Sequence, residues 1–435
     1  MKISENMKKE TSDLIEFLNK SPTAEWAVCN LAKDLESEGF EKLTESDKFE
    51  LNPGDKFYIE KNDSSLLAGI IGNADLEKNG FKIIGAHTDS PGFQVKYEGM
   101  YEEEGYKQLG VEIYGGPLIA SWTDRDLSLA GKVALDKGGK IVTKRWKSES
   151  SLLRISQLPI HLNRDVNDEG LKLEKEQHLP PMIGQADEKE FTRNSIKGII
   201  AEDMGIEPSE ISDFDLKLYD TQPASLLGLD EEFFASGRVD NLMACHCAIS
   251  SLTNVNTVPE NTVIVSLFDN EEVGSNTASG GASPFLPNIL ERVTLSLGLT
   301  RAEYLVTLAN SFLLSIDGAH AVHPNYPDAF EKDHKVQLNK GPVIKLNANQ
   351  KYVTDPGNTA EFKRICNNAD LPSQVYINRA DKPSGSTIGP ITSTRTGIRT
   401  MDIGPPMVSM HSVREMAGVK DTHYLTRAIT EYIGT

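Results

Sequence analysis

Short apolar runs rich in β-branched residues, each bounded by polar turns, alternate with helical segments over much of this 435-residue chain. The runs are FKIIGAH (81–87), TVIVSLFD (262–269), FLLSID (312–317), PVIKLN (342–347), QVYINR (374–379) and GIRTMDIG (397–404). Strands that alternate with helices build a mostly parallel sheet covered by helices. The pattern therefore predicts an α/β fold, in which functional side chains gather at the carboxyl ends of the strands.

The stretch from about residue 93 to 234 has a different character. GKVALDKGGKIVTKRW reads as two alternating strands around a Gly-Gly turn, which is typical of a hairpin. No comparable succession of strands and helices occurs there. Because His87 precedes this stretch and Asp240 follows it, a site that uses both residues would make the stretch an insertion. We predict a discontinuous catalytic domain, 1–92 and 235–435, interrupted by a β-rich domain over 93–234.

Two further helices are predicted, over 241–253 and 415–433. Ser412 and Glu415 match the S-x-x-E capping box at the start of the second helix. The first helix contains Cys245-His246-Cys247, whose spacing does not fit a zinc knuckle, so a buried helical segment is the preferred interpretation.

Composition excludes several classes of partner. The formal net charge is -19, so the chain has no basic surplus that would release counterions from nucleic acid or attract it to anionic membranes. No segment approaches the ~18 apolar residues of a membrane span, and the N-terminus lacks the apolar core of a signal peptide. Four unpatterned cysteines indicate free thiols in a reducing compartment, and we expect a cytoplasmic protein.

Imidazoles and carboxylates without thiols recur in short segments of unusual composition. These segments are GAHTDS, SGRVDN, DNEEVGS, SIDGAH and MHSVRE, which carry His87, Asp240, Glu271, Glu272, Asp317 and His411. Such a ligand set suits two Zn²⁺, Mn²⁺ or Co²⁺ ions that share a bridging carboxylate. A pair of ions about 3.5–4 Å apart is a hydrolytic centre. The sequence predicts a two-metal hydrolase.

Each motif also has a plainer interpretation. His87 with Asp89 could belong to a surface loop, and Asp240 could simply cap a helix. His320 and His323 compete with His411 as the second imidazole. Glu271-Glu272 is harder to dismiss, because adjacent carboxylates repel each other. A metal ligand beside a general base would explain that pair.

The motifs together resemble the aspartyl aminopeptidase family over essentially the whole chain. They are, in order, GAHTDSPGFQVK, SWTDRDLSLAGKV, LPIHLNRDVN, SGRVDNLMACHC, DNEEVGS, DGAHAVHPNY, SGSTIGP and MHSVRE. The resemblance implies an α/β/α sandwich of the zinc-exopeptidase type with an inserted β-rich dimerisation domain. It also implies two divalent ions per subunit, most often zinc, and a dodecamer built from dimers.

The same resemblance implies a role for individual residues. His87 and Asp317 would bind the first ion, Glu272 and His411 the second, and Asp240 would bridge the two. The remaining roles follow from the same motifs: Glu271 as general base, Asp89 as the residue that orients His87, Lys351 facing an acidic substrate side chain, and His161 reaching into the partner subunit's active site. His320 and His323 would then be structural.

We therefore expect a metal-dependent aminopeptidase that removes N-terminal residues, preferentially Asp or Glu, from peptides by metal-activated water. Three alternatives stay open: an aminopeptidase of broad or neutral specificity, another two-metal amide hydrolase such as a deacylase, and a cargo or scaffold shell without activity. Activity on a panel of aminoacyl and N-acyl substrates would distinguish the expected acidic aminopeptidase from a broad-specificity aminopeptidase and from a deacylase. The intact Glu271 and ligand set argue against the third.

Overall fold

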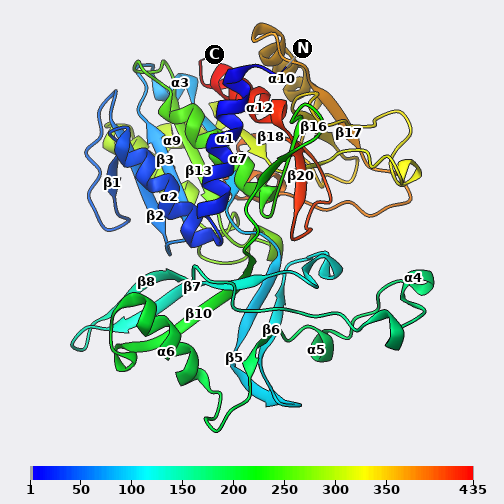
Figure 1. The fold of residues 1–435 in the computed structure, drawn as a ribbon. Helices are drawn as coiled ribbons and strands as arrows, with labels where there is room; N and C mark the ends of the chain where they lie inside the picture. The colour runs from blue at the N-terminus through cyan, green and yellow to red at the C-terminus, as the bar shows by residue number, and fades with distance from the viewer. Residues whose placement is uncertain (1–2, 435) are drawn as a thin grey trace. The chain divides into compact units, whose positions relative to one another are not determined.

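The computed structural model describes residues 3–434, which form two compact units (Figure 1). The first unit runs to Ser90, resumes over Ala224–Met410 and ends with the segment that begins at Glu415. The second unit comprises Pro91–Pro223 and the short segment His411–Arg414. The chain thus leaves the first unit after Ser90 and returns at Ala224, earlier than the predicted return at 235.

A nine-stranded mixed sheet forms the centre of the first unit. Its central strands run parallel to one another, from β13 through β4 and β14 to β18, whereas β3 and β16 flank them in antiparallel orientation. In sheet order the strands are β1 (Glu41–Leu43), β2 (Lys56–Lys61), β3 (Ser65–Ile70), β13 (Thr262–Phe268), β4 (Phe81–His87), β14 (Phe312–Ile316), β18 (Arg399–Gly404), β16 (Val343–Leu346) and β17 (Gln374–Ile377). The carboxyl ends of β4, β13 and β14 therefore share one edge of the sheet.

Helices cover both faces of this sheet, which makes the first unit an α/β/α sandwich. One face packs against α1 (Glu5–Lys20), α2 (Ala24–Ser37), α7 (Val239–Thr253), α10 (Pro356–Asn368) and α12 (Val419–Gly434). The other packs against α3 (Leu76–Asn79), α8 (Phe285–Ser296), α9 (Arg301–Asn310) and α11 (Ile388–Thr396). Successive strand residues point to opposite faces, so Ile84 joins the first core and Ile83 the second.

A smaller sheet beside the sandwich explains where the chain returns. Its order is β11 (Ser225–Leu227), β12 (Phe233–Ser236), β20 (Glu415–Gly418), β19 (Pro406–Val408) and β15 (Ala319–His320). Because β11 and β12 pair into this sheet, residues 224–234 belong to the first unit.

Pairing in the same sheet also overturns the predicted capping box. Glu415 lies in β20 opposite Ser236, and α12 begins only at Val419. The Ser412 hydroxyl instead accepts the backbone N–H of Arg414.

The second unit is built on a six-stranded sheet in which every neighbouring pair is antiparallel. In sheet order its strands are β8 (Ile141–Lys147), β7 (Leu127–Asp136), β10 (Ile211–Asp220), β5 (Gly92–Glu103), β6 (Tyr106–Tyr114) and β9 (Met182–Gln185). The hairpin predicted around Gly138-Gly139 is confirmed as β7 and β8. Helix α6 (Arg193–Met204) packs on the sheet and contributes Ile196 and Ile200 to a separate core.

Short helical turns complete both units. The second unit contains η1 (Ile119–Trp122), η2 (Ile160–Leu162), α4 (Val166–Glu169), α5 (Lys175–His178) and η3 (Pro208–Glu210). The first contains η4 (Glu271–Val273) and η5 (Pro327–Ala329).

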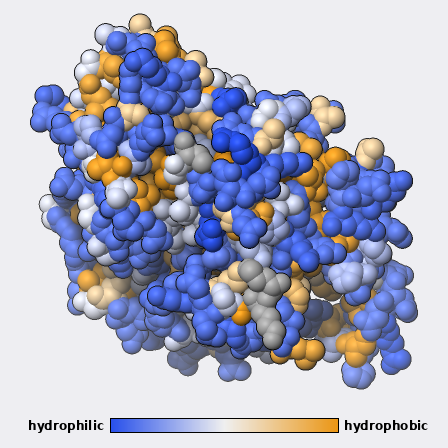
Figure 2. Space-filling model, turned by 90° about the horizontal axis from the view of Figure 1, so that it is seen from above, coloured by the Kyte–Doolittle hydropathy of each residue, from blue (hydrophilic) through white to orange (hydrophobic). Residues whose placement is uncertain are grey.

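The face in Figure 2 is mostly hydrophilic, with hydrophobic residues in small separate areas. Such a surface fits a chain in which 25% of the residues are charged. Among residues 3–434, no helix has the length and apolar character needed to cross a membrane. The cysteines are free thiols, and Cys245, Cys247 and Cys366 are buried.

Candidate metal centre

Three parallel strands deliver acidic and imidazole side chains to one edge of the large sheet. His87 is the last residue of β4 and pairs in register with Phe268, the last residue of β13. Glu271 and Glu272 follow β13 in the η4 turn, and Asp317 follows β14 directly. The rule that functional groups gather at the carboxyl ends of parallel strands accounts for this convergence.

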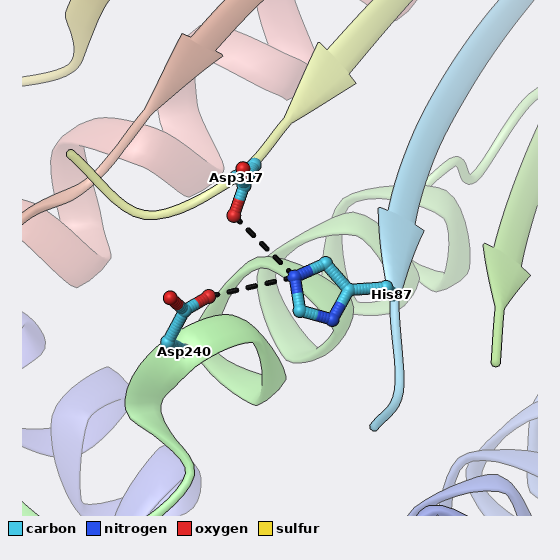
Figure 3. Close-up of side chains that lie close together, drawn as sticks. All are labelled: His87, Asp240 and Asp317. Atoms are coloured by element: carbon cyan, nitrogen blue, oxygen red, sulfur yellow. Dashed lines mark hydrogen bonds and ion pairs between the residues drawn. The ribbon is translucent and has the colours of Figure 1, made fainter. Parts of the chain in front are cut away.

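The imidazole of His87 lies between two carboxylates (Figure 3). Its Nε2 is 3.5 Å from Oδ1 of Asp240 and 3.4 Å from Oδ1 of Asp317. All three residues are buried, with at most 8% of their surface exposed. Burial lowers the pKa of His87, but hydrogen bonds to Asp240, Asp317 and Asp89 outweigh it and leave that pKa well above its usual value.

Asp89 connects His87 to the Glu271-Glu272 pair. The backbone carbonyl of Asp89 lies 3.1 Å from Nδ1 of His87, and its carboxylate Oδ1 lies 3.5 Å from the same nitrogen. Because a carbonyl only accepts, Nδ1 carries a proton, and Nε2 is the nitrogen that faces Asp240 and Asp317. A metal ion at that position would replace the proton on Nε2. The two carboxylate oxygens of Asp89 accept the backbone N–H groups of Glu271 and Glu272, each at 3.1 Å.

Glu271 and Glu272 form a second group of potential ligand atoms with His87, within 4.8 Å of one another. Burial raises the pKa of Glu271 to about 8, against the opposing effect of His87. A cation beside this carboxyl would favour its ionised form. The first such group joins His87 to Asp240 and Asp317.

Lys345 is a charged neighbour of the cluster that the motifs did not reveal. It lies in β16, is 2% exposed, and its Nζ donates to Oδ2 of Asp317 at 3.3 Å. Burial lowers the pKa of Lys345, but Asp317, Tyr352 and Asp402 outweigh it, so the pKa is raised. The sequence does contain one sign of this role: Lys345 stands between Ile344 and Leu346 in an apolar run. A lysine buried in such a run needs a charged or polar partner for its ammonium group.

The donor set fits a divalent metal of the zinc type. Ions of this type prefer an imidazole nitrogen together with carboxylates. His87 offers Nε2, because its other ring nitrogen bonds to Asp89, and several buried carboxylates surround it. Without a cation, these adjacent buried carboxylates would repel one another.

Comparison with known proteins places the chain in a family. Residues 17–432 match the family described as aminopeptidase I zinc metalloprotease (M18). This chain belongs to the M18 aminopeptidases.

Its relatives share most of their length with it. A probable M18 family aminopeptidase 2 of Clostridium novyi is 42% identical over 431 residues, which cover 98% of this chain and 99% of the relative. A chain in the cryo-EM structure of the Ape4 and Nbr1 complex superposes with a TM-score of 0.96 at 37% identity, covering 100% of this chain and 88% of that one. A chain of the S. cerevisiae mApe1 dodecamer gives a TM-score of 0.85 at 27% identity, with coverage of 99% and 97%.

This M18 aminopeptidase is thus a hydrolase that acts on peptides and belongs to a family of zinc metalloproteases. The α/β fold class expected from the sequence is confirmed by the structures that it matches.

Lys351, which the resemblance placed opposite an acidic substrate side chain, is exposed. The turn after β16 carries it outward, and its backbone N–H donates to Oδ1 of Asn347 at 3.4 Å.

The two remaining predicted site histidines belong to the second unit. Nδ1 of His411 donates to the carbonyl of Gly116 at 3.0 Å, so Nε2 of His411 carries the lone pair that a metal would require. His161 lies in the η2 turn and is exposed.

The competing histidines of the first unit make aromatic contacts. The ring of His320 packs edge-on against Tyr376 with centroids 5.8 Å apart, and that of His323 lies 4.9 Å from Tyr326.

Proposed function

We propose that this M18 aminopeptidase hydrolyses the N-terminal peptide bond with two divalent ions. The observation that carries the proposal is the arrangement around His87, whose Nε2 faces two buried carboxylates while Asp89 holds Glu271 and Glu272 nearby. His87, Asp317 and Asp240 would hold the first ion. Glu272 and His411 would hold the second, with Asp240 shared. Bound ions of this kind polarise a carbonyl and lower the pKa of water toward neutrality.

Glu271 is the general base in this proposal. Its backbone is fixed by Asp89, and its half-buried carboxyl group feels the charges of His87 and Asp317. It accepts a proton from the attacking water and passes that proton to the leaving amine. Burial supports the role, because a base with a pKa close to the working pH transfers protons most effectively.

An acidic N-terminal residue is the proposed substrate preference. The ammonium group of Lys345 supports it, because this charge is buried next to Asp317 and would meet a carboxylate that entered the cluster. A charge-assisted hydrogen bond in such a place contributes roughly 1.5–3 kcal/mol. Lys345 takes over here the role that the resemblance implied for Lys351, whose side chain is exposed.

Self-association through the second unit is the third part of the proposal. His161 lies between the exposed side chains of Ile160 and Leu162, which are 45% and 72% exposed. An exposed apolar turn with a histidine at its centre suits burial against another subunit. His161 would then donate a hydrogen bond to the developing oxyanion in its partner's active site. A dodecamer built from dimers in the cytoplasm is the assembly that we propose.

One experiment tests the core of the proposal. The purified enzyme is treated with a chelator, the metal content is measured, and Zn²⁺, Mn²⁺ or Co²⁺ is added back. Activity is then followed on aminoacyl substrates with N-terminal Asp, Glu, Leu and Lys, and on their N-acylated counterparts. Metal-dependent cleavage of the free-amine Asp and Glu substrates is the expected result. Preferential cleavage of N-acylated substrates would indicate a deacylase instead.

A further inference from the structure

A buried glutamate outside the proposed ligand set reaches the backbone of Asp240. Glu415 is 1% exposed and lies in β20 opposite Ser236 of β12. Asp240 follows Ser236 by four residues, after a tight turn in which Arg238 has a positive φ of 61°. The register of the small sheet therefore brings the Glu415 carboxylate to the start of α7. Its Oε2 accepts the backbone N–H of Asp240 at 3.0 Å.

Hydrogen bonds from other segments fix the peptide groups on both sides of Asp240. The hydroxyl of Ser90 donates to the carbonyl of Asp240 at 2.7 Å. The side-chain amide of Asn241 donates to the carbonyl of Ile316 at 2.7 Å, one residue before Asp317. Asp240 is thus connected through short hydrogen bonds to the segments that carry Asp89 and Asp317.

We propose that Glu415 and Ser90 are positioning residues that hold Asp240 in the orientation needed to bind metal. The inference rests on the proposed function, because it assigns the two residues a task only if Asp240 is a ligand. A bridging carboxylate has to present both oxygens in fixed directions, and its backbone sets those directions. A buried acceptor on the Asp240 N–H is a strong restraint, since leaving a buried N–H without an acceptor costs about 1–3 kcal/mol.

Residues that support metal ligands through hydrogen bonds typically change metal affinity by 10–100-fold when they are lost. A purely structural role would give a different result. Loss of Glu415 would then lower stability and leave the affinity for zinc unchanged. Metal affinity and stability must therefore be measured separately, on the metal-free protein.

The variants are Glu415→Met, Glu415→Gln and Ser90→Ala. Glu415→Met keeps the length of the side chain and removes the acceptor, whereas Glu415→Gln keeps an oxygen that can accept the same N–H. The matched control is Asp421→Leu. Asp421 is also a buried carboxylate, and it accepts the backbone N–H groups of Asn339 and Gly341 rather than that of Asp240.

Zinc dissociation constants are measured by competition with a chromophoric chelator, and the melting temperature of each metal-free variant is recorded. We expect Glu415→Met and Ser90→Ala to bind zinc about 10–100-fold more weakly than the wild type. Glu415→Gln should stay close to the wild type. Asp421→Leu should melt at a lower temperature with its zinc affinity retained.

Two negative results have different meanings. Wild-type affinity in both Glu415→Met and Ser90→Ala overturns the positioning role alone. A wild-type protein that binds no zinc overturns the proposed function, and the positioning role with it. If Glu415→Met does not fold, Ser90→Ala decides the question, because it removes only one hydroxyl.

Discussion

The carboxylate of Asp89, which follows β4, accepts at 3.1 Å the backbone N–H of Glu271, which follows the neighbouring strand β13. Its second oxygen accepts the N–H of Glu272 at the same distance, and its carbonyl faces Nδ1 of His87. One residue therefore sets the position of a proposed ligand, of the proposed base and of the imidazole. The two glutamates are adjacent in sequence and share this support, so their separate functions have to be found by substitution.

Glu271→Gln and Glu272→Gln should fail in different ways. Glu271→Gln should retain its metal and lose turnover by at least ~10²–10⁴, because it removes the proton acceptor and leaves the proposed ligands intact. Glu272→Gln should lose bound metal. Metal content per chain and kcat, measured on both variants, check this prediction. The reverse distribution of metal loss would show that the two roles are interchanged.

Chelation should abolish activity, and zinc should restore at least part of it. Asp240→Asn should reduce bound metal more than Glu272→Gln does, because a bridging carboxylate serves two ions. Metal analysis by mass spectrometry gives the number of ions in each protein. An enzyme that turns over fully without metal would contradict the proposed chemistry.

Substrate preference should depend on Lys345 and not on Lys351. We expect the wild type to favour N-terminal Asp or Glu over Leu by roughly tenfold or more, as a charge-assisted bond of roughly 1.5–3 kcal/mol allows. Lys345→Met should remove that preference, and Lys351→Met serves as the control with an exposed lysine. The ratio of kcat/KM for Asp and Leu substrates is the measurement. Equal rates for Asp, Leu and Lys substrates in the wild type would point to broad specificity.

His161→Ala should keep its metal and its oligomeric state while losing rate by about 10²–10³, as expected for the loss of an oxyanion donor. Subunit exchange between His161→Ala and Glu271→Gln should recover part of the activity, because some mixed sites then hold both functional residues. Light scattering reports the oligomeric state alongside the rate. A fully active monomer would rule out completion of the site by a second subunit.

The stability of the metal-free protein should fall in mild acid because of His246. Burial lowers the pKa of His246 to about 4, and among residues 3–434 nothing hydrogen-bonds to its buried Nδ1. The unfolded imidazole titrates near 6.5, so the unfolded state binds an extra proton between these values. This stabilising contribution is complete above pH about 6.5 and is lost as the pH falls to about 4, by up to about 3 kcal/mol.

His246→Leu should flatten this dependence in urea unfolding curves recorded from pH 7 to pH 4. His178→Gln is the matched control, because His178 is exposed on a short helix of the second unit. Parallel curves for the wild type and His246→Leu would refute the assignment.

Much of the centre could be predicted because its residues lie at recognisable points in local patterns. His87, Asp317 and the Glu271-Glu272 pair each end or follow an apolar run, and parallel strands bring such ends to one edge. Periodicity and turn residues suffice for these assignments, because strand formation and strand ends depend on residues close in sequence.

Glu415 and Lys345 required the tertiary structure. The S-x-x-E pattern at Ser412 is compatible with a helix cap. In the structure, however, Glu415 pairs with strand β12, which lies nearly two hundred residues earlier in the chain, and the helix begins only at Val419. Lys345 lies in an apolar run, but its partner Asp317 is far from it in sequence, and only the fold brings the two charges together. The sequence by itself determined which side chains reach the strand ends. The long-range pairing of strands and charges decided which other residues support them, because a buried charge or peptide group is stable only with a partner that the fold brings from elsewhere.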